Sequence, residues 1–489
     1  MSGRSWGVLL VLCGAIFLEG IDIAMLNVAL PSIRADLGLS TGALQWVMSA
    51  YVLGYGGFML LGGRAADLFG RRRMFLLPLA VFLVFSGLGG IAGDGWTLVL
   101  ARFVTGACAA FMMPAGLSVI TTGFPAGRQR TKALLVYSGT GGGGFSVGLV
   151  AGGLLTAADW RWVFFAPVVL AAVILAAGLP LIPRTEAIRA KEVRAAGTRA
   201  TPRPRLDLPG AVTVTGAILL FVLTVERASH APPVRTLATF AAALVLLLAF
   251  VLIERRSAAP LVRPGIFRTR SLVRAGLTGL LFTAGFFGFQ FIAVLYLREL
   301  RGWSTLQASF AMLAMGADVV LAPVLTPRLV RRFGTARVIL GGLLLAVVAY
   351  AAFLPLGMDR AYAAMFPSLL LIGIAFALVH GPLTITATEG VAEPEQGLAA
   401  GLLYTSLQFG AALGLSAATA VATAVAGAAT APGDGGLLTA YRAALLVPLL
   451  TAVLAVLISP RNHRSRRLRP LTPPKPALCG PGARGGRGE

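Results

Sequence analysis

The sequence contains few charged residues for its length of 489 residues. Asp, Glu, Lys and Arg make up 12% of it, whereas an average soluble protein carries roughly 25%. Hydrophobic residues make up 57%, so a soluble fold is excluded as the first interpretation. Lys is nearly absent, with 3 residues against 39 Arg. This bias, together with abundant Ala, Gly and Pro, is typical of a GC-rich genome and indicates a bacterial source.

Cysteines are scarce as well. The three are Cys13, Cys108 and Cys479, and the first two lie inside apolar runs, where Cys behaves as a small hydrophobic residue. They give neither a disulfide framework nor a metal-ligand spacing, so no metal or other cofactor is expected. No phosphate-binding motif G-x-x-x-x-G-K followed by Ser or Thr occurs, which argues against ATP as the energy source. No nucleophile and base constellation is recognisable either, so we do not expect an enzyme.

The formal net charge of +23 has two interpretations. Spread over a soluble surface it would favour nucleic acid as a partner. The basic residues are instead confined to gaps between long apolar runs, which favours a lipid bilayer and no nucleic acid. The Gly- and Arg-rich tail over 461–489 is interpreted in the same way, as a cytoplasmic segment near anionic lipid rather than an RNA-binding segment.

Long apolar runs are the strongest feature of the sequence. A helix needs about 20 mostly apolar residues to cross a bilayer, because its backbone polar groups must be paired internally. The first run is too long for the apolar core of a signal peptide and contains Glu19 and Asp22. The sequence predicts an all-α integral membrane protein with fourteen transmembrane helices, near residues 8–30, 43–61, 74–92, 97–121, 133–156, 162–182, 209–225, 236–253, 275–296, 306–326, 338–356, 361–387, 397–426 and 443–459.

The distribution of Arg and Lys predicts the orientation of these spans. With both termini in the cytoplasm, 33 of the 42 basic residues lie in cytoplasmic segments, 8 in external loops and one, Arg102, inside a span. Cytoplasmic loops of membrane proteins carry an excess of basic residues, and one missed or added span would invert every later loop. We therefore expect a multi-pass protein of the cell membrane with both termini cytoplasmic.

One loop motif repeats at an offset of 264 residues. Five residues between spans two and three recur between spans ten and eleven: Arg64, Phe69, Gly70, Arg73 and Leu76 recur as Arg328, Phe333, Gly334, Arg337 and Leu340. Two six-helix halves are typical of transporters that work by alternating access, with the binding site at the midplane between the halves. The expected parts are an N-terminal half over 1–182, a basic linker over 183–208, two inserted helices over 209–253, a cytoplasmic loop over 254–274, a C-terminal half over 275–459 and a basic tail over 460–489.

Ionisable residues inside the spans are few, and each is a functional candidate because its insertion costs several kcal/mol. Glu19 and Asp22 are three residues apart on one face of the first span. Arg102, in the fourth span, reaches a depth similar to that of Asp22. Apolar surroundings disfavour an isolated carboxylate charge and a nearby Arg favours it, so relative movement can load and release a proton. A buried structural ion pair is the alternative.

Further polar residues in the spans are candidates for a substrate cavity. Asp318 in span ten either binds a cationic substrate, carries a second proton or reaches the cytoplasmic side near Arg331. The neutral side chains are more often helix-packing hydrogen bonders than ligand contacts. The candidate set is Asn27, Gln290, Asp318, His380 and Gln408.

A glycine-rich run over 139–153 matches two enzyme motifs. Gly139, Gly141 and Gly144 fit a dinucleotide fingerprint, and residues 144–148 fit a hydrolase nucleophile elbow, but neither has the required strand and turn around it. We interpret the run as a transmembrane helix with a nearly smooth face, which allows close helix approach and bending. The positions expected to give this flexibility are Gly148, Gly152 and Gly153.

Four segments together resemble one known family. They are Asp22 followed by Asn-Val-Ala-Leu-Pro over 27–31, Trp-Val and Ser-Ala-Tyr over 46–51, Arg102 with Gly106, and Trp-Arg-Trp-Val-Phe-Phe over 160–165. They are similar to the fourteen-spanner drug:proton antiporters of the major facilitator superfamily, and the resemblance extends over nearly the whole chain. It implies the major facilitator fold, with Asp22 and Arg102 as proton-coupling residues. Glu19 is a third proton-coupling candidate because it lies on the same face of the first span as Asp22.

The loop over 63–73 resembles the superfamily's signature between spans two and three. The resemblance implies a charge-linked latch that holds the outward-open arrangement, formed by Gly63, Arg64, Asp67, Gly70, Arg71, Arg72 and Arg73. The sequence departs from the family twice. Leu68 stands where Arg is usual, so the latch would rely on Arg64 or Arg71, and span five has Leu149 where the antiporter signature has Pro.

The favoured function is therefore a proton-coupled efflux antiporter that exports amphipathic organic compounds, such as a drug, an antibiotic or another secondary metabolite. Its partners would be a small-molecule substrate and protons. The alternative is a proton-linked or facilitated importer of a small metabolite. A receptor or scaffold would need neither buried acids nor a repeated loop motif.

Overall fold

The computed structural model describes residues 3–125, 127–183, 207–227, 232–257, 260, 262, 264–358, 360–389, 391–392, 395–428 and 434–459. Within these ranges every regular element is helical. Most of the predicted linker, residues 184–206, and the predicted tail over 460–489 lie outside the described residues.

The described α-helices follow one another along the chain. In chain order they are α1 (Gly3–Leu37), α2 (Thr41–Phe69), α3 (Arg71–Gly90), α4 (Gly95–Gly123), α5 (Arg128–Ala158), α6 (Trp162–Leu181), α8 (Leu208–Arg227), α9 (Pro233–Arg256), α10 (Arg270–Leu295), α11 (Thr305–Met312), α12 (Asp318–Phe333), α13 (Thr335–Phe353), α14 (Tyr362–Thr388), α15 (Gln396–Ala428), α16 (Asp434–Ala444) and α17 (Leu446–Ile458). Three short helices of other geometry are η1 (Pro264–Arg268), η2 (Tyr296–Leu300) and η3 (Leu313–Ala317).

The described helices agree with a polytopic membrane protein. Twelve of them are long and apolar enough to cross a membrane. Two shorter apolar segments, Pro209–Phe221 and Leu306–Ala317, stand at the places of predicted spans seven and ten. The structure is therefore compatible with fourteen crossings.

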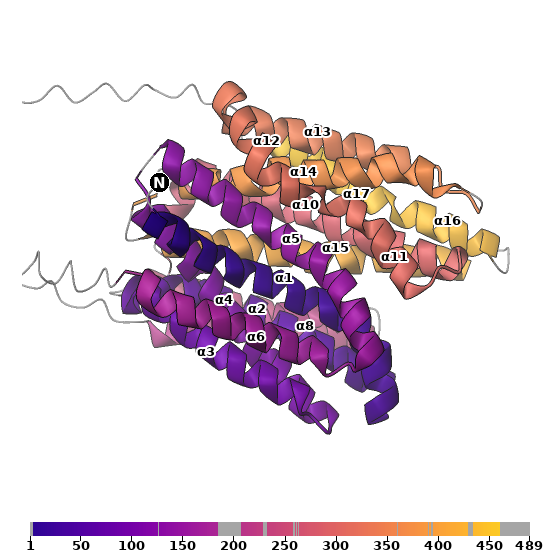
Figure 1. Cartoon of the computed structure of the whole chain (residues 1–489), viewed down its shortest axis with the longest axis horizontal. Helices are drawn as coiled ribbons and strands as arrows, with labels where there is room; N and C mark the ends of the chain where they lie inside the picture. The colour runs from indigo at the N-terminus through magenta and orange to yellow at the C-terminus, as the bar shows by residue number, and fades with distance from the viewer. Residues whose placement is uncertain are drawn as a thin grey trace, which may run out of the picture.

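Helices α1–α6 and α10–α17 form two bundles with the same internal packing order (Figure 1). In the N-terminal set, α1 packs on α5 and α6, and α4 packs on α2 and α3. In the C-terminal set, α10 packs on α15 and α17, and α14 packs on α12 and α13. The two sets meet through α2 with α15 and through α5 with α12. If the sets are copies of one six-helix unit, α2 corresponds to α12 and α5 corresponds to α15. The α2–α15 contact and the α5–α12 contact are then equivalent.

The repeated loop motif has the same backbone conformation in both places. Gly70 ends α2 and precedes α3 with φ of 98°, and Gly334 ends α12 and precedes α13 with φ of 83°. Side-chain-bearing residues rarely adopt positive φ, whereas glycine does so readily. The motif therefore repeats because both turns require glycine at the same place.

The two inserted helices do not lie apart from the bundles. Helix α8 packs on α9, and it also contacts α2 of the N-terminal set and α15 of the C-terminal set. The Phe221 and Phe409 rings meet edge to face, with centroids 5.1 Å apart. Helix α8 therefore covers the seam between α2 and α15.

The predicted continuous span over 306–326 is broken in the structure. Helix α11 ends at Met312, the backbone then tightens into η3, and α12 begins at Asp318. The carbonyl of Met315 lies against Gly373 of α14, where an added Cβ would come within 2.2 Å of the oxygen. Irregular backbone at membrane depth is tolerated where protein surrounds it or where it lines a cavity.

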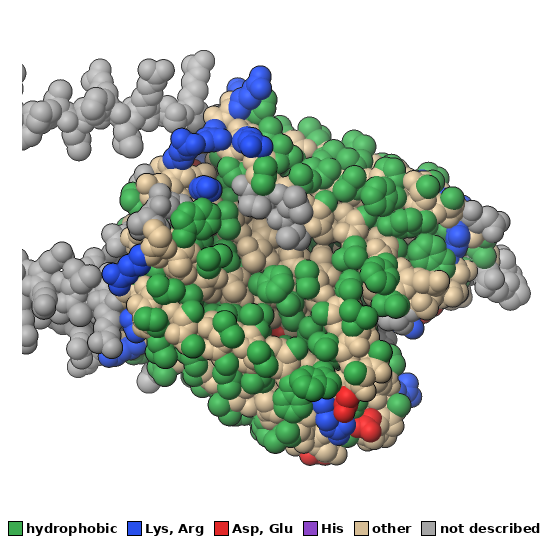
Figure 2. Space-filling model, viewed as in Figure 1, with side chains coloured by type: hydrophobic (Ala, Val, Ile, Leu, Met, Phe, Trp, Pro, Cys, Tyr) green, Lys and Arg blue, Asp and Glu red, His purple; other side chains and the backbone are tan. Residues whose placement is uncertain are grey.

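Apolar side chains cover the flank of the molecule, and Lys and Arg gather mainly at the end where the N-terminus lies (Figure 2). A separate group of Asp and Arg side chains lies at the other end (Figure 2). Asp36 near the end of α1 and Arg161 before α6 form an ion pair, with Arg161 Nη1 3.0 Å from Asp36 Oδ2. An apolar flank with charged ends suits a protein embedded in a bilayer.

The predicted orientation can be tested with single cysteines at glycines where an added side chain meets no other atom within 4 Å. Gly93 and Gly357 lie at the predicted external end, and Gly265 lies at the predicted cytoplasmic end. In a chain whose native cysteines are replaced by Ala, we expect Gly93→Cys and Gly357→Cys to react with a membrane-impermeant maleimide on intact cells. Gly265→Cys should react only after the membrane is opened. The reverse pattern would contradict the orientation.

Candidate functional site

The central feature of the site is a buried ion pair between α1 and α4. Arg102 Nη1 lies 2.6 Å from Asp22 Oδ2, and the two side chains are 3% and 2% exposed. Removing one partner of such a pair leaves an uncompensated buried charge, which costs about 3–5 kcal/mol. The structure therefore brings together the two residues whose charges were expected to interact.

The Arg102 guanidinium also packs on an aromatic ring of α2. Its Cζ atom lies 4.3 Å from the centroid of the Tyr51 ring, a distance typical of cation–π attraction. Tyr51 is 2% exposed, and its hydroxyl has no hydrogen-bond partner among the described residues. The face of the ring, rather than the hydroxyl, therefore holds Arg102.

Close contact between backbones places these side chains. An added Cβ at Gly54 of α2 or at Gly106 of α4 would lie 2.2 Å from a carbonyl oxygen of the other helix, that of Phe103 or Tyr51. Because both positions are glycine, α2 and α4 approach closely enough for the Tyr51 ring to cover Arg102.

The smooth face predicted for the fifth span packs on α1. An added Cβ would lie 2.4 Å from the Phe17 carbonyl oxygen at Gly144, and 2.8 Å from α1 atoms at Gly148 and Gly152. The expected close helix approach is therefore confirmed at these three positions. Gly153 faces elsewhere, since its Cβ would lie 3.2 Å from Leu306 of α11. The flexibility of this helix stays a prediction.

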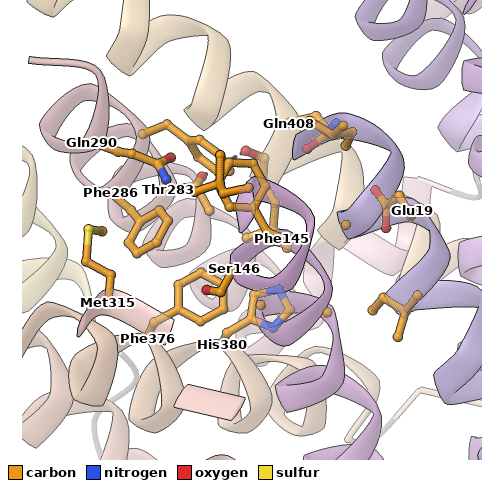
Figure 3. A pocket seen from close by; sticks show the side chains of 18 of the residues that line it. Glu19, Phe145, Ser146, Thr283, Phe286, Gln290, Met315, Phe376, His380 and Gln408 are labelled. Atoms are coloured by element: carbon orange, nitrogen blue, oxygen red, sulfur yellow. Dashed lines mark hydrogen bonds between the residues drawn. The ribbon is translucent and has the colours of Figure 1, made fainter. Parts of the chain in front are cut away.

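One turn along α1 from Asp22, Glu19 lines a cavity of about 150 Å³ between the two bundles (Figure 3). The lining comes from α1, α2 and α5 on one side and from α10, α11, η3, α14 and α15 on the other. Its other polar side chains include Tyr55, Ser146, Thr283, Gln290, His380, Tyr404 and Gln408. Its apolar aromatic side chains are Phe145, Phe286, Phe287 and Phe376.

Two tyrosines connect the cavity with the ion pair. The Tyr55 hydroxyl lies next to the Glu19 carboxylate. Tyr51 and Tyr55 are one helical turn apart on α2, with ring centroids 5.8 Å apart. A chain of side-chain contacts therefore runs from Asp22 through Arg102, Tyr51 and Tyr55 to Glu19.

The structure places most of the predicted cavity residues, but not all of them, around this cavity. Gln290, His380 and Gln408 line it. Asn27 does not line it: its side chain is exposed, and it lies eight residues beyond Glu19 on α1, a rise of about 12 Å. The side chain of Asp318 lies outside the described residues.

The predicted latch loop joins the two bundles at the end that carries the N-terminus. The Asp67 carboxylate accepts hydrogen bonds from the backbone N–H groups of Gly397 and Leu398, at 3.2 and 3.1 Å. These groups belong to the N-terminus of α15, where unpaired N–H groups and the helix dipole favour an anion. The partner of Asp67 across the seam is thus a helix end, which the sequence did not predict.

Other residues of the loop have different tasks. An added Cβ at Gly63 would lie 2.5 Å from the Gly397 carbonyl oxygen, so glycine permits the close contact of α2 with α15. Arg64 is buried and donates to the Pro260 carbonyl after α9, at 3.4 Å. Arg72 donates to the carbonyls of Leu179, at 2.6 Å, and Ile182, and so holds the end of α6. Arg73 is exposed.

Sequence reasoning missed the tyrosine chain and the aromatic walls of the cavity. Tyr51 and Tyr55 are four residues apart in an apolar span, and this spacing places two polar-tipped rings on one helix face. That signal was available in the sequence. The Phe residues gave no signal, because aromatic residues are common in every transmembrane helix.

Comparisons with known proteins agree with this architecture. The family model of the Major Facilitator Superfamily matches residues 12–415. The chain is 38% identical to a puromycin resistance protein of Streptomyces alboniger, over 94% of this chain and 92% of that protein. It is 35% identical to the cephamycin export protein CmcT of Amycolatopsis lactamdurans, over 92% of each.

Solved structures share the fold. The crystal structure of the human organic anion transporter MFSD10 matches with a TM-score of 0.65 at 16% identity, covering 94% of this chain and all of that chain. At this identity the likeness extends to the fold alone.

The Asp67 contact predicts a measurable shift between conformations. Asp67→Asn removes the charge from the hydrogen bonds to α15, which weakens them by about 1–2 kcal/mol and lowers the ratio of closed to open seam roughly 5- to 30-fold. Ser138 of α5 is 1% exposed, with its Oγ 3.5 Å from Thr384 Oγ1 of α14, at another contact between the two bundles. We expect the alkylation rate of Ser138→Cys to rise accordingly in the Asp67→Asn background. Asp94→Asn, which removes an exposed acid at the start of α4, is the control, and an unchanged rate in inserted Asp67→Asn protein would count against the latch.

The Tyr51 ring predicts a contrast between two substitutions. Tyr51→Phe keeps the aromatic face and loses only an unpartnered hydroxyl, so it should keep near-normal thermal stability and transport. Tyr51→Leu loses the cation–π attraction, about 1–2 kcal/mol at a desolvated site, and should slow transport about 10-fold. Equal losses in the two variants would show that the hydroxyl, and not the ring face, is needed.

Proposed function

Because the chain belongs to the Major Facilitator Superfamily, we propose that it is a proton-coupled efflux antiporter that exports amphipathic organic compounds by alternating access. The observation that carries this proposal is the buried Asp22–Arg102 pair, one helical turn from a cavity that lies between the two bundles. A cavity between two repeats is where transporters of this architecture bind their substrates.

The relatives support export rather than import. Two of them are named for puromycin resistance and cephamycin export, and a third, 34% identical over 95% of this chain, for lincomycin resistance in Streptomyces lincolnensis. We propose that this chain likewise moves an antibiotic or a related secondary metabolite out of a bacterial cell. In this proposal both termini lie in the cytoplasm, as the distribution of basic residues predicts.

The proposed coupling step uses the ion pair directly. In the conformation described here Asp22 forms an ion pair with Arg102. Movement of α4 and α2 relative to α1 would separate the pair, and an isolated carboxylate in apolar surroundings favours protonation. In each cycle the protein would then alternate between a conformation in which Asp22 is ionised and one in which Asp22 is protonated.

Alternating access needs two halves that move relative to each other, and the separation of α1 from α4 would be a smaller shift inside one half. We propose residues 1–182 and 275–459 as these halves, with 209–253 as inserted helices between them. The matched packing order of the two bundles supports this division. In one state the contact between Asp67 and α15 would be present and the cytoplasmic end closed. In the other state the contact would be broken and that end open.

The coupling role of Asp22 can be tested in proteoliposomes. Asp22→Asn should abolish transport driven by a pH gradient, because the amide cannot exchange a proton. Downhill exchange of substrate should persist, since the amide resembles the protonated acid. The measurement is substrate-dependent proton flux over a panel of cationic, neutral and anionic compounds.

A second variant covers the chance that Asp22→Asn fails to insert. Asp22→Asn with Arg102→Gln removes both charges, so no unpaired charge remains buried. Uphill transport at the normal proton cost in either variant would move the coupling role to another acid, Glu19 or Asp318.

A further inference from the structure

An acid in the last turn of α1 is held by two side chains that precede α6. Asp36 Oδ2 accepts hydrogen bonds from Trp160 Nε1 at 2.9 Å and from Arg161 Nη1 at 3.0 Å. The Arg161 guanidinium also lies over the Trp160 ring, with its Cζ atom 4.5 Å from the ring centroid. These three side chains, here called the α1 clamp, join the first and the sixth helix of the N-terminal bundle.

The α1 clamp is continuous with a packed apolar cluster. Trp160 is 4% exposed and belongs to this cluster together with Val163 and Phe164 of α6. The members from α1 are Ile21, Met25, Leu26, Ala29 and Ile33. Ile21 is the neighbour of Asp22 in the chain, so the packed side of α1 extends from the clamp to the buried ion pair.

The backbone of α1 is interrupted between the clamp and the ion pair. Pro31 lies inside the helix. Proline has no N–H to donate to the carbonyl four residues before it, and such a position allows a helix to bend. Ala29 and Ile33, on either side of Pro31, both belong to the cluster. The clamp and the cluster therefore hold both parts of α1 on α6.

The C-terminal bundle has an equivalent contact. The Tyr441 hydroxyl of α16 donates to Glu299 Oε2 of η2, which follows α10. Helix α10 packs on α15 and α17 as α1 packs on α5 and α6. In both bundles the acid at the end of the first helix binds an aromatic residue that Arg follows, namely Trp160–Arg161 and Tyr441–Arg442. Of the two copies, the N-terminal one lies on the helix that carries Asp22.

We propose that Asp36 is a positioning residue for Asp22: through Trp160 and Arg161 it holds α1 where Asp22 contacts Arg102, and so sets how readily Asp22 takes up a proton. This inference rests on the proposed proton coupling and deepens it. Asp36 itself does not line the cavity, and it lies 14 residues beyond Asp22 on α1, a rise of about 21 Å. It therefore acts through the position of the helix and not by contact.

The surroundings of Asp22 leave Arg102 as the partner on which this effect depends. The other titratable side chains around the pair are Glu19, Tyr51 and Cys108. The parts of α5 and α6 over 138–158 and 162–181 contain no Asp, Glu, His, Cys, Tyr, Lys or Arg. A looser α1 would lengthen the distance between Asp22 and Arg102, and a more distant Arg favours the protonated acid.

The test is an infrared titration of the purified full-length protein in lipid nanodiscs. A protonated carboxyl group has a carbonyl band separate from the carboxylate bands, and the band that is missing in Asp22→Asn protein is assigned to Asp22. We expect Asp36→Asn to move the midpoint of this band upward by about half a pH unit, as for the loss of an exposed ion pair. Asp36→Glu keeps the charge and should stay close to the wild-type midpoint.

Two further variants separate positioning from general loosening of the protein. Glu299→Gln breaks the equivalent contact in the C-terminal bundle, so it should lower thermal stability about as much as Asp36→Asn and leave the midpoint of Asp22 unchanged. Trp160→Phe keeps a ring in the apolar cluster and removes the N–H donor to Asp36. It should move the midpoint in the same direction as Asp36→Asn, and it tests the inference even if Asp36→Asn fails to fold.

Three results would overturn the inference: an unchanged midpoint in Asp36→Asn and Trp160→Phe, an equal shift in Glu299→Gln, or an Asp22 band that does not titrate in wild-type protein. The proposed function is measured separately, as uphill export by the wild-type protein. Loss of the expected midpoint shifts in a protein that exports would overturn only the role of Asp36. The expected shifts in a protein that does not export would overturn the proposed function and leave the role of Asp36 standing.

Discussion

The ion pair between Asp22 and Arg102 is the interaction on which the rest of the site depends. Both side chains are almost fully buried among apolar helices, where neither charge is stable without the other. Arg102 is also held by the Tyr51 ring, and Tyr51 is followed on α2 by Tyr55 beside Glu19. A shift of any one of these side chains therefore changes the surroundings of the next. This contiguity gives the proton site and the cavity a physical route by which each can affect the other.

Glycine contacts decide how the helices that carry these residues can move. Helix α5 packs on the α1 backbone through Gly144, Gly148 and Gly152, so few side chains interlock across that contact. Its other side faces the C-terminal bundle, where an added Cβ at Gly381 would lie 2.8 Å from Leu135 and one at Gly316 would lie 2.5 Å from Ser146. Helix α5 is therefore in contact both with the helix that carries the two acids and with the opposite wall of the cavity.

The seam between α2 and α15 has two kinds of contact along its length. At one end Asp67 accepts hydrogen bonds from the N-terminus of α15, and water can replace these bonds when the seam opens. Farther along, α8 covers the seam with apolar side chains, such as Leu219 against Gly57 and Phe221 against Phe409. Apolar contacts are non-directional, so they tolerate sliding. The inserted helices thus lie where they can shield the seam in more than one arrangement of the bundles.

The membrane class, the approximate places of most helices and the repeated loop motif follow from the sequence alone, because these depend on local properties: long apolar runs and glycine at Gly70 and Gly334, where φ is positive. The sequence also identified Asp22, Glu19 and Arg102, since any ionisable residue in a span is conspicuous. Only the tertiary structure decided which of them touch, that Asn27 lies outside the cavity, and that Asp67 binds the end of α15. Span ten looked continuous because its break at η3 depends on the packing of Met315 against Gly373. Contacts between distant helices depend on how closely their backbones approach, and that follows from the packing of the whole bundle rather than from any one segment.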